Sequence, residues 1–274
     1  MVQSESQVGA VPTAADSWTD LTNFTVPAGV KRLCKVRFAL APDVGTSASS
    51  VRQAPVFRLT GSGLLEQNPH EYLGPFGGQS MVTSGGVAME NMAVEYDVDI
   101  PVQTGGIITV SVNTLDEAIT AGTVMANLYY DEKDVSAANS MSQYVDAAAA
   151  GTADVWTAVG TLTVPAPAPE KSPKKIRAIC IGVALDQGTS AISLRTAPRI
   201  RLTGSGIGEG GSHEFVGPTA ASAEVTAGAI AYSKLNAKID VDIPVSASGA
   251  IVVEQRFDGE VPTAGTIAVG LLYA

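Results

Sequence analysis

Cysteine is scarce in this sequence: only Cys34 and Cys180 occur among 274 residues. Two cysteines are too few for a disulfide framework or a structural zinc site. Charged residues are also few, at 16%, and aromatic residues make up 5%. No run of apolar residues approaches the roughly 18 that a transmembrane helix needs, so we expect none. Residues 1–15 lack the basic and apolar regions of a secretory signal, and we expect no such signal there.

Positive charge is too sparse for direct binding of nucleic acid. The formal net charge is −10, and the densest group of lysines lies within Lys171–Lys175. A nucleic-acid binder presents a basic stripe that displaces counterions, so we expect no direct nucleic-acid binding. The 28 glycines and 15 prolines indicate instead many short strands joined by turns.

What the sequence does contain is an internal duplication. Residues 54–130 align with residues 197–273 without a gap at a spacing of 143 positions, and 33 of the 77 pairs are identical. Upstream, Trp18 corresponds to Trp156 at a spacing of 138. A repeat of this size is a whole domain rather than a solenoid unit. The repeated segments are Arg58–Gly63 and Arg201–Gly206, His70–Glu71 and His213–Glu214, Gly74–Pro75 and Gly217–Pro218, Asp97–Val102 and Asp240–Val245, and Thr120–Thr123 and Thr263–Thr266.

The duplication predicts two domains, residues 16–132 and residues 154–274. Residues 1–15 precede them as a polar N-terminal arm, which we expect to be mobile or docked on a neighbouring molecule. Residues 133–153, rich in Ala, Ser and Asn, are interpreted as the linker between the domains.

Three segments distinguish the two halves: the arm, the linker and a Pro-rich insertion at Ala166–Lys175. In the linker we expect one short helix that carries Met141, Tyr144 and Val145. None of these segments has an evident role in filling a domain core. We therefore expect them to mediate contacts between subunits.

Alternating apolar residues predict antiparallel β-sandwiches. Cys34, Val36, Phe38 and Leu40 fall on one face of a strand, and similar alternation recurs along both repeats. No long segment of helical period interrupts the strands, which argues against a parallel α/β sheet. Roughly seven or eight strands in about 120 residues fit a jelly roll or an immunoglobulin-like sandwich, and the Cys–Trp–Cys pattern of the latter is missing. The predicted fold class is all-β, with two tandem jelly rolls joined by a linker with a short helix.

The two cysteines do not occupy equivalent positions in this alignment. Cys34 aligns with Ile179 at a spacing of 145, so we expect it to be buried and unpaired. Cys180 aligns with Lys35 on the opposite face. Neither position suggests the electropositive pocket that a catalytic cysteine needs.

The two histidines are candidates for a metal or acid–base site. His70 and His213 occupy equivalent positions and each is followed by glutamate. A His–Glu pair supplies at most two ligands, and no further catalytic group lies near in sequence. A loop histidine retained in both copies is the simpler interpretation.

Two pairs of aspartates are candidates for an ion site. Calcium takes six to eight oxygen ligands, whereas each pair supplies two carboxylates on one strand face. The simpler interpretation is the solvated face of a half-buried strand, with a salt bridge as an intermediate possibility. The sequence leaves open whether the histidines or these aspartates bind an ion; the aspartates are Asp97, Asp99, Asp240 and Asp242.

Two further features have a structural and a functional interpretation. Gly61–Gly63 and its repeat lack the full dinucleotide fingerprint and a following helix, so a plain turn is favoured over a phosphate loop. Trp18 and Trp156 could stack on sugars, but each precedes a first strand and is interpreted as its anchor. The sequence thus predicts no catalytic residue, no cofactor-binding residue and no metal ligand, and we expect the protein not to be an enzyme.

Two similar jelly rolls in one chain resemble the double jelly-roll major capsid proteins of icosahedral, often membrane-containing, viruses. The resemblance covers residues 16–274 and rests on architecture, without a family motif. It implies a structural protein of the virion, in which three chains form a capsomer with six similar lobes. The implied partners are further copies of the chain and minor capsid or membrane-associated proteins.

Two alternatives remain open at this point. The chain fits an extracellular filament or surface-layer subunit, in which the N-terminal arm completes the sheet of a neighbour. It also fits a tandem carbohydrate-binding module that uses Trp18 and Trp156. Neither the host nor the lattice symmetry follows from the sequence.

Overall fold

The structure is a computed structural model that describes residues 2–10, 14–43, 50–66, 68–80, 93–115, 121–135, 141–149, 152–166, 174–186, 193–218, 220–223, 230–232, 236–259 and 264–274. The regular elements in these residues are β-strands, which confirms the all-β fold class. Across the described part of the chain, no helix has the length and apolarity to cross a membrane. The sequence also predicts a weaker strand near Val87; that segment and most of the Pro-rich insertion lie outside the described residues.

The first sandwich contains eight principal strands: β1 (Val2–Ala10), β2 (Thr19–Thr25), β3 (Arg32–Asp43), β5 (Pro55–Thr60), β6 (His70–Leu73), β8 (Ala93–Pro101), β9 (Ile107–Thr114) and β10 (Ala121–Asp131). Sheet 1a has the order β1-β10-β3-β8 and sheet 1b the order β2-β9-β5-β6. All neighbouring strands are antiparallel. This division of eight strands between two facing sheets is that of a jelly roll.

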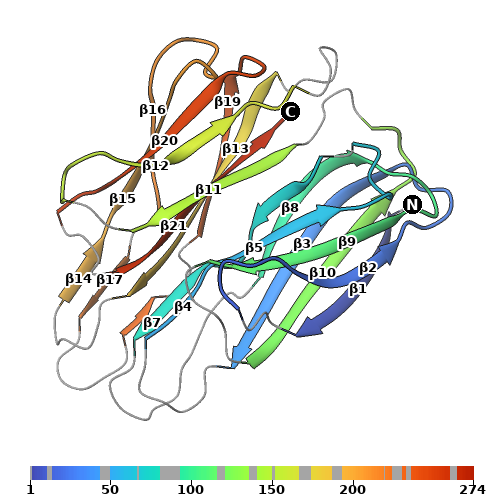
Figure 1. Ribbon diagram of the computed structural model, residues 1–274, viewed down its shortest axis with the longest axis horizontal. Coiled ribbons are helices and arrows are strands. Elements are labelled where there is room, and N and C mark those ends of the chain that lie inside the picture. The colour runs from blue at the N-terminus through green and yellow to red at the C-terminus, as the bar shows by residue number, and fades with distance from the viewer. Residues whose placement is uncertain are drawn as a thin grey trace.

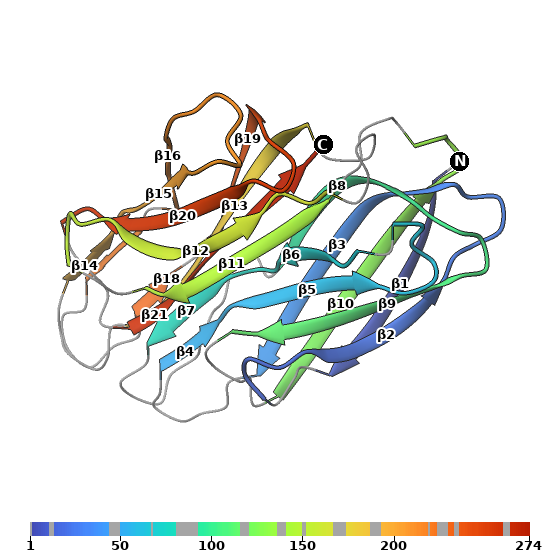
Figure 2. The ribbon, with the colours of Figure 1, turned by 45° about the horizontal axis from the view of Figure 1, so that its top comes forward.

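The second sandwich repeats this arrangement with β11 (Ser142–Ala148), β12 (Thr157–Thr163), β13 (Lys175–Asp186), β15 (Pro198–Thr203), β16 (His213–Val216), β19 (Asn236–Pro244), β20 (Ala250–Phe257) and β21 (Ala264–Tyr273). Sheet 2a has the order β11-β21-β13-β19 and sheet 2b the order β12-β20-β15-β16. The two sandwiches lie side by side (Figure 1), and the turned view shows the same arrangement (Figure 2).

Five short strands form two smaller sheets at one end of the molecule (Figure 1). They are β4 (Ser50–Gln53), β7 (Gly77–Ser80), β14 (Ser193–Thr196), β17 (Ala220–Ala223) and β18 (Ile230–Tyr232). β14 pairs with β17 inside the second sandwich, whereas β7 of the first sandwich pairs with β4 on one side and with β18 of the second sandwich on the other. A strand pairing therefore connects the two sandwiches.

The core of the first sandwich follows the alternation in the sequence. Val36, Phe38 and Leu40 on β3 are at most 1% exposed and face sheet 1b. The ring of Phe38 stacks on that of Phe57 of β5, with 4.2 Å between ring centroids. The expected inner face of this strand is thus confirmed for the three residues after Cys34.

The expected helix in the linker is wrong, because residues 142–148 form the edge strand β11 of sheet 2a. Val145 and Ala147 pack against the second core, whereas Tyr144 packs against the core of the first sandwich. This alternation has the period of a strand. The alanine-rich composition favours a helix locally, but pairing with β21 overrides that propensity.

The N-terminal arm is also not a free segment, because its residues 2–10 form the strand β1. β1 pairs with β10 over nine residues, from Val2–Asp131 to Ala10–Thr123. It occupies the same edge of sheet 1a that β11 occupies in sheet 2a. The expectation of a mobile or neighbour-docked arm is therefore corrected: the segment completes its own sandwich. Its polar sequence hid this because an edge strand buries little.

The alignment of Cys34 with Ile179 is corrected by a β-bulge. β3 shifts register against β10 between Leu33 and Lys35, so that Cys34 is an extra residue with no partner on β10. Its thiol lies 3.2 Å from the carbonyl oxygen of Tyr129, and the residue is free but only partly buried. From Val36 onward the strands match at a spacing of 143, so that Arg37, not Lys35, corresponds to Cys180.

Candidate functional site: the interface between the two sandwiches

The outer face of sheet 2a is covered by the first sandwich. Its side chains are small, and those of Ala178, Cys180, Ala184 and Ala268 are at most 4% exposed. They belong to the hydrophobic cluster of the first sandwich rather than to that of the second. The apolar cluster of the first sandwich therefore extends across the interface onto the outer face of sheet 2a, while the inside of the second sandwich forms a separate cluster.

Two side chains of the first sandwich fit against glycines of sheet 2a. A Cβ atom placed on Gly182 of β13 would lie 2.7 Å from the ring of Phe76. A Cβ atom on Gly270 of β21 would lie 3.4 Å from Cγ of Leu73, at the end of β6. The absence of a side chain at Gly182 is thus what lets Phe76 approach the sheet so closely.

Polar contacts fix the chain that carries these two side chains. The backbone amide of Phe76 donates to Oδ1 of Asn236 at 2.7 Å, and Nδ2 of Asn236 donates to the carbonyl oxygen of Gly74 at 2.9 Å. The hydroxyl of Tyr96 donates to the carbonyl oxygen of Leu73 at 2.6 Å. Residues 73–76 are therefore held by both sandwiches at once.

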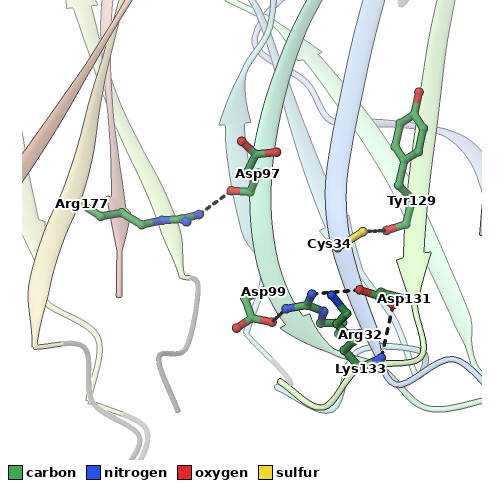
Figure 3. Close-up of polar contacts among 8 residues, drawn as sticks. All are labelled: Arg32, Cys34, Asp97, Asp99, Tyr129, Asp131, Lys133 and Arg177. Atoms are coloured by element: carbon green, nitrogen blue, oxygen red, sulfur yellow. Dashed lines mark hydrogen bonds and ion pairs between the residues drawn. The ribbon is translucent and has the colours of Figure 1, made fainter. Parts of the chain in front are cut away.

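A third polar contact crosses between β13 and β8 (Figure 3). Nη2 of Arg177 donates to the carbonyl oxygen of Asp97 at 2.6 Å. Arg177 occupies the bulge of β13 that corresponds to the bulge at Cys34 in β3. The same structural position therefore carries a long donor in one copy and a thiol in the other, and only the donor reaches the partner sandwich.

Trp18 is partly buried and packs against side chains from both sandwiches. The guanidinium carbon of Arg58 lies 4.1 Å from its ring centroid, and Tyr144 of β11 approaches edge-on at 6.5 Å between centroids. Its counterpart Trp156 keeps the stacking arginine, Arg201, at 4.5 Å. The anchoring interpretation fits both tryptophans, because each holds the strand sequence before β2 or β12 against β5 or β15.

Two carboxyl groups at the interface are partly desolvated. Burial raises the pKa of Glu71 on β6, and the charge of Arg58 lowers it by a smaller amount. Burial also raises the pKa of Asp146 on β11, and the charge of Asp16 raises it further. Glu71 lines a groove of about 340 Å³ between β6 and β11. At this end of the interface, Asp146 and Asp16 therefore repel each other, whereas Glu71 has Arg58 as a favourable charge partner.

The histidines and aspartates do not come together as a site. His70 is fully buried, with Nε2 3.8 Å from Oε2 of Glu66, whereas His213 is only partly buried. Within the described residues, no group of three or more His, Cys, Asp or Glu side chains is arranged to hold a metal. The aspartates lie in ion pairs with neighbouring cations: Asp97–Lys35 at 3.6 Å, Asp99–Arg32 at 3.0 Å (Figure 3), Asp240–Lys238 at 3.6 Å and Asp242–Lys175 at 2.7 Å.

The repeated Thr-Gly-Ser-Gly segment is a turn. Gly61 has φ 115° and Gly204 has φ 111°. A Cβ atom on either glycine would collide with a backbone oxygen at the start of the neighbouring strand, β9 or β20. The hydroxyl oxygen of Ser62 accepts the backbone amide of Ile107 at 3.1 Å. The turn interpretation agrees with this geometry, because the glycine backbone and the Ser62 hydroxyl group hold the turn after β5 against the start of β9.

Sequence reasoning missed the residues that distinguish the covered sheet from its open counterpart. The outer face of sheet 1a carries polar or larger residues where sheet 2a carries small or apolar ones. This signal was present within the strands of the duplicated sequence, not in the segments between them. The pairs, at a spacing of 143, are Lys35–Ala178, Arg37–Cys180, Ala39–Gly182, Met125–Ala268, Asn127–Gly270 and Tyr129–Leu272.

Comparison with protein-family models and with the sequences of curated proteins gives no match. Among solved structures, the chain is similar to the major capsid protein P2 of bacteriophage PM2, with 9% identity, a TM-score of 0.40, and coverage of 100% of this chain and 97% of that chain. Capsid proteins are thus among the structural neighbours. A T=1 nodavirus of Penaeus vannamei is similar at 10% identity and a TM-score of 0.23, covering 99% and 97%.

An enzyme is similar to the same degree. PNGase F, a glycosylasparaginase of Flavobacterium meningosepticum, has 8% identity and a TM-score of 0.40, with coverage of 100% of this chain and 96% of that chain. Likenesses of this strength do not distinguish a capsid subunit from an enzyme. The function is therefore inferred from the interface itself.

Proposed function

We propose that this protein is a structural, self-assembling subunit: a viral major capsid protein whose chains form trimeric, pseudo-hexameric capsomers. One observation carries the proposal, namely that the sandwiches meet head to tail. The first contributes the edge strand β6 and the second contributes the outer face of sheet 2a. Because the sandwiches are duplicates, each has the equivalent of both surfaces, although sheet 1a carries polar or larger side chains where sheet 2a carries small or apolar ones. The edge strand β16 and the outer face of sheet 1a are therefore left at opposite ends of the chain.

A contact between two different surfaces of similar units is heterologous. Such contacts repeat until they close a ring or extend as a filament. With two sandwiches per chain, three chains supply the six lobes of a closed pseudo-hexagonal ring. If the rotation between successive units does not close, the same contact produces the alternative, a filament or surface-layer subunit.

The proposal assigns the chain to the virion and gives it no enzymatic activity and no cofactor. The residues with unusual chemistry recur in both halves, as structural residues do after duplication. The second alternative, a carbohydrate-binding module, is less well supported because Trp18 is partly buried, with Arg58 over its ring and Tyr144 edge-on to it. In the capsid proposal, the partners of this protein are further copies of the chain, together with minor capsid or membrane-associated proteins.

The mass and shape of the assembled protein test this function. We expect light scattering coupled to size exclusion to give the mass of a trimer or a larger closed assembly, and negative-stain images to show six-lobed rings or shells. Fibres of indefinite length would replace the capsid proposal with the filament alternative. A monomer at every concentration and ionic strength would contradict both.

A further inference from the structure

Val216 occupies an unusual position for an apolar side chain. It ends β16, the edge strand of sheet 2b, and is 64% exposed. Its counterpart at a spacing of 143 is Leu73, which is 1% exposed because it packs against Gly270 across the interface. The duplicated position that joins the sandwiches in one copy is thus left uncovered in the other.

A hollow of about 200 Å³ lies on the outer face of sheet 1a, lined by Ser6, Arg37, Ala39, Met125 and Asn127. Met125 is itself 38% exposed.

Each residue of the hollow corresponds to a residue of the covered face in the second sandwich: Tyr144, Cys180, Gly182, Ala268 and Gly270, in the same order. Gly182 and Gly270 are the positions that receive Phe76 and Leu73. The hollow therefore lies where the covered sheet accepts the side chains of the first sandwich.

We propose that Val216 of one chain inserts into this hollow on a second copy of the chain, and so repeats between chains the contact that Leu73 makes within one. This inference rests on the proposed function and names the surfaces that would form the assembly. The occupant is a second copy because the chain already contains one docked example of the equivalent two surfaces, with Arg37, Ala39 and Asn127 of the hollow in place of Cys180, Gly182 and Gly270. Glu214, two residues from Val216 on the same face of β16, and Arg37 of the hollow bring opposite charges to the two sides.

The short strands are consistent with a contact between the second sandwich of one chain and the first sandwich of another. β7 of the first sandwich pairs on both sides, with β4 and with β18 of the other sandwich. Its counterpart β17 pairs with β14 alone within the described residues. Within the described residues, β17 therefore lacks the second pairing that β7 makes with β18, although β18 also lies close to β17.

Disulfide cross-linking tests the proposed contact directly. The variant Val216→Cys/Asn127→Cys places thiols at the positions that correspond to Leu73 and Gly270. Under mild oxidation we expect covalent products of two and three chains on a non-reducing gel, and longer ladders only if the assembly is a filament. The matched control, Leu73→Cys/Gly270→Cys, should close a disulfide within one chain. Each single-cysteine variant controls for reaction with Cys34 and with Cys180, whose Cβ atom would lie 3.6 Å from that of a residue at position 270.

A charge at position 216 gives a second, independent measurement. We expect Val216→Asp to raise the protein concentration needed for assembly by at least about tenfold, as for the loss of a central contact residue. Leu65→Asp is the matched control, because Leu65 is 55% exposed but lies after β5, outside both surfaces. Unchanged melting temperatures would show that both variants fold.

The outcomes separate the contact from the function. If wild-type assemblies form but Val216→Asp assembles normally and the double-cysteine variant stays uncross-linked, the proposed contact is wrong and the assembly function stands. If the wild-type chain never assembles, both are wrong. Cross-linked trimers together with loss of assembly in Val216→Asp support both.

Discussion

At the scale of single residues, the interface between the two sandwiches depends on glycine having no side chain. Gly182 lies opposite the ring of Phe76, with 2.7 Å from that ring to where a Cβ atom would stand. Gly182 has no positive φ, so the requirement comes from space rather than from backbone conformation. Its counterpart in the first sandwich is Ala39, on an open face, where a Cβ atom is accommodated.

We therefore expect Gly182→Leu to lower the free energy of unfolding by about 1–3 kcal/mol, the usual cost of overpacking a buried site. The matched change Ala39→Leu, measured below the concentration at which the protein assembles, should alter it by less than about 0.5 kcal/mol, because Ala39 lies on the uncovered outer face of sheet 1a and is only partly buried. Urea unfolding of both variants, followed by circular dichroism, checks the difference. Equal effects would mean that Phe76 does not pack there in solution.

Asp146 should make the stability of the folded protein depend on pH, and the sign of this dependence follows from its raised pKa. In the unfolded chain its pKa is about 3.9, whereas burial and Asp16 raise it in the folded protein. Between the two values the folded state binds more protons, so its contribution to stability falls as pH rises through this window. We expect Asp146→Asn to increase stability at pH 7 and to leave it nearly unchanged near pH 3. Unfolding temperatures measured at both pH values test this; no gain at pH 7 would contradict it.

At the scale of secondary-structure elements, the edge strands β1 and β11 are the parts that determine where each sandwich begins. β1 pairs with β10 and β11 pairs with β21, and both precede their tryptophan at the same distance along the chain. β11 also presents Tyr144 to the first sandwich. The segment that joins the two repeats in sequence therefore also joins them in space.

Deletion of residues 1–10 should expose the edge of β10. We expect amide hydrogen exchange in β10 to accelerate by at least about tenfold, because the backbone groups that paired with β1 become open to water. The equivalent strand β21, still covered by β11, is the internal control. Unchanged exchange in β10 would show that β1 does not pair with β10 in solution. That result would instead favour an arm that docks on a neighbouring molecule.

At the scale of the whole molecule, duplication supplies its own control for the interface. Leu73 and Val216 are equivalent residues, one 1% exposed and the other 64% exposed. Only the first lies between the sandwiches. Their substitution thus measures how strongly the two sandwiches stabilise each other.

We expect Leu73→Ala to lower the free energy of unfolding by about 2–5 kcal/mol, the range for a buried leucine. It should also separate the unfolding of the two sandwiches, visible as two calorimetric transitions. Val216→Ala, measured below the concentration at which the protein assembles, should change stability by less than about 0.5 kcal/mol. Similar losses in both variants would contradict the interface.

The jelly-roll fold was predictable from the sequence because inward-facing residues such as Val36, Phe38 and Leu40 alternate with a period that is local to each strand. The duplication was predictable because identical turns need identical residues, as at Gly61 and Gly204. The two edge strands were not, since a strand paired on one side buries too little to impose a pattern on its sequence.

Only the tertiary structure decided which of the duplicated faces meet. The sequence itself shows that the second repeat has Cys180 and Gly270 at the positions equivalent to Arg37 and Asn127 of the first. The meaning of this difference depends on the bulge at Cys34, which changes the register of β3, and on the sandwich that covers sheet 2a. A small side chain is compatible with a turn, a core or an interface, and the surface that lies against it is set by residues more than a hundred positions away. Sequence alone therefore determined the two building blocks, and packing between them determined the site.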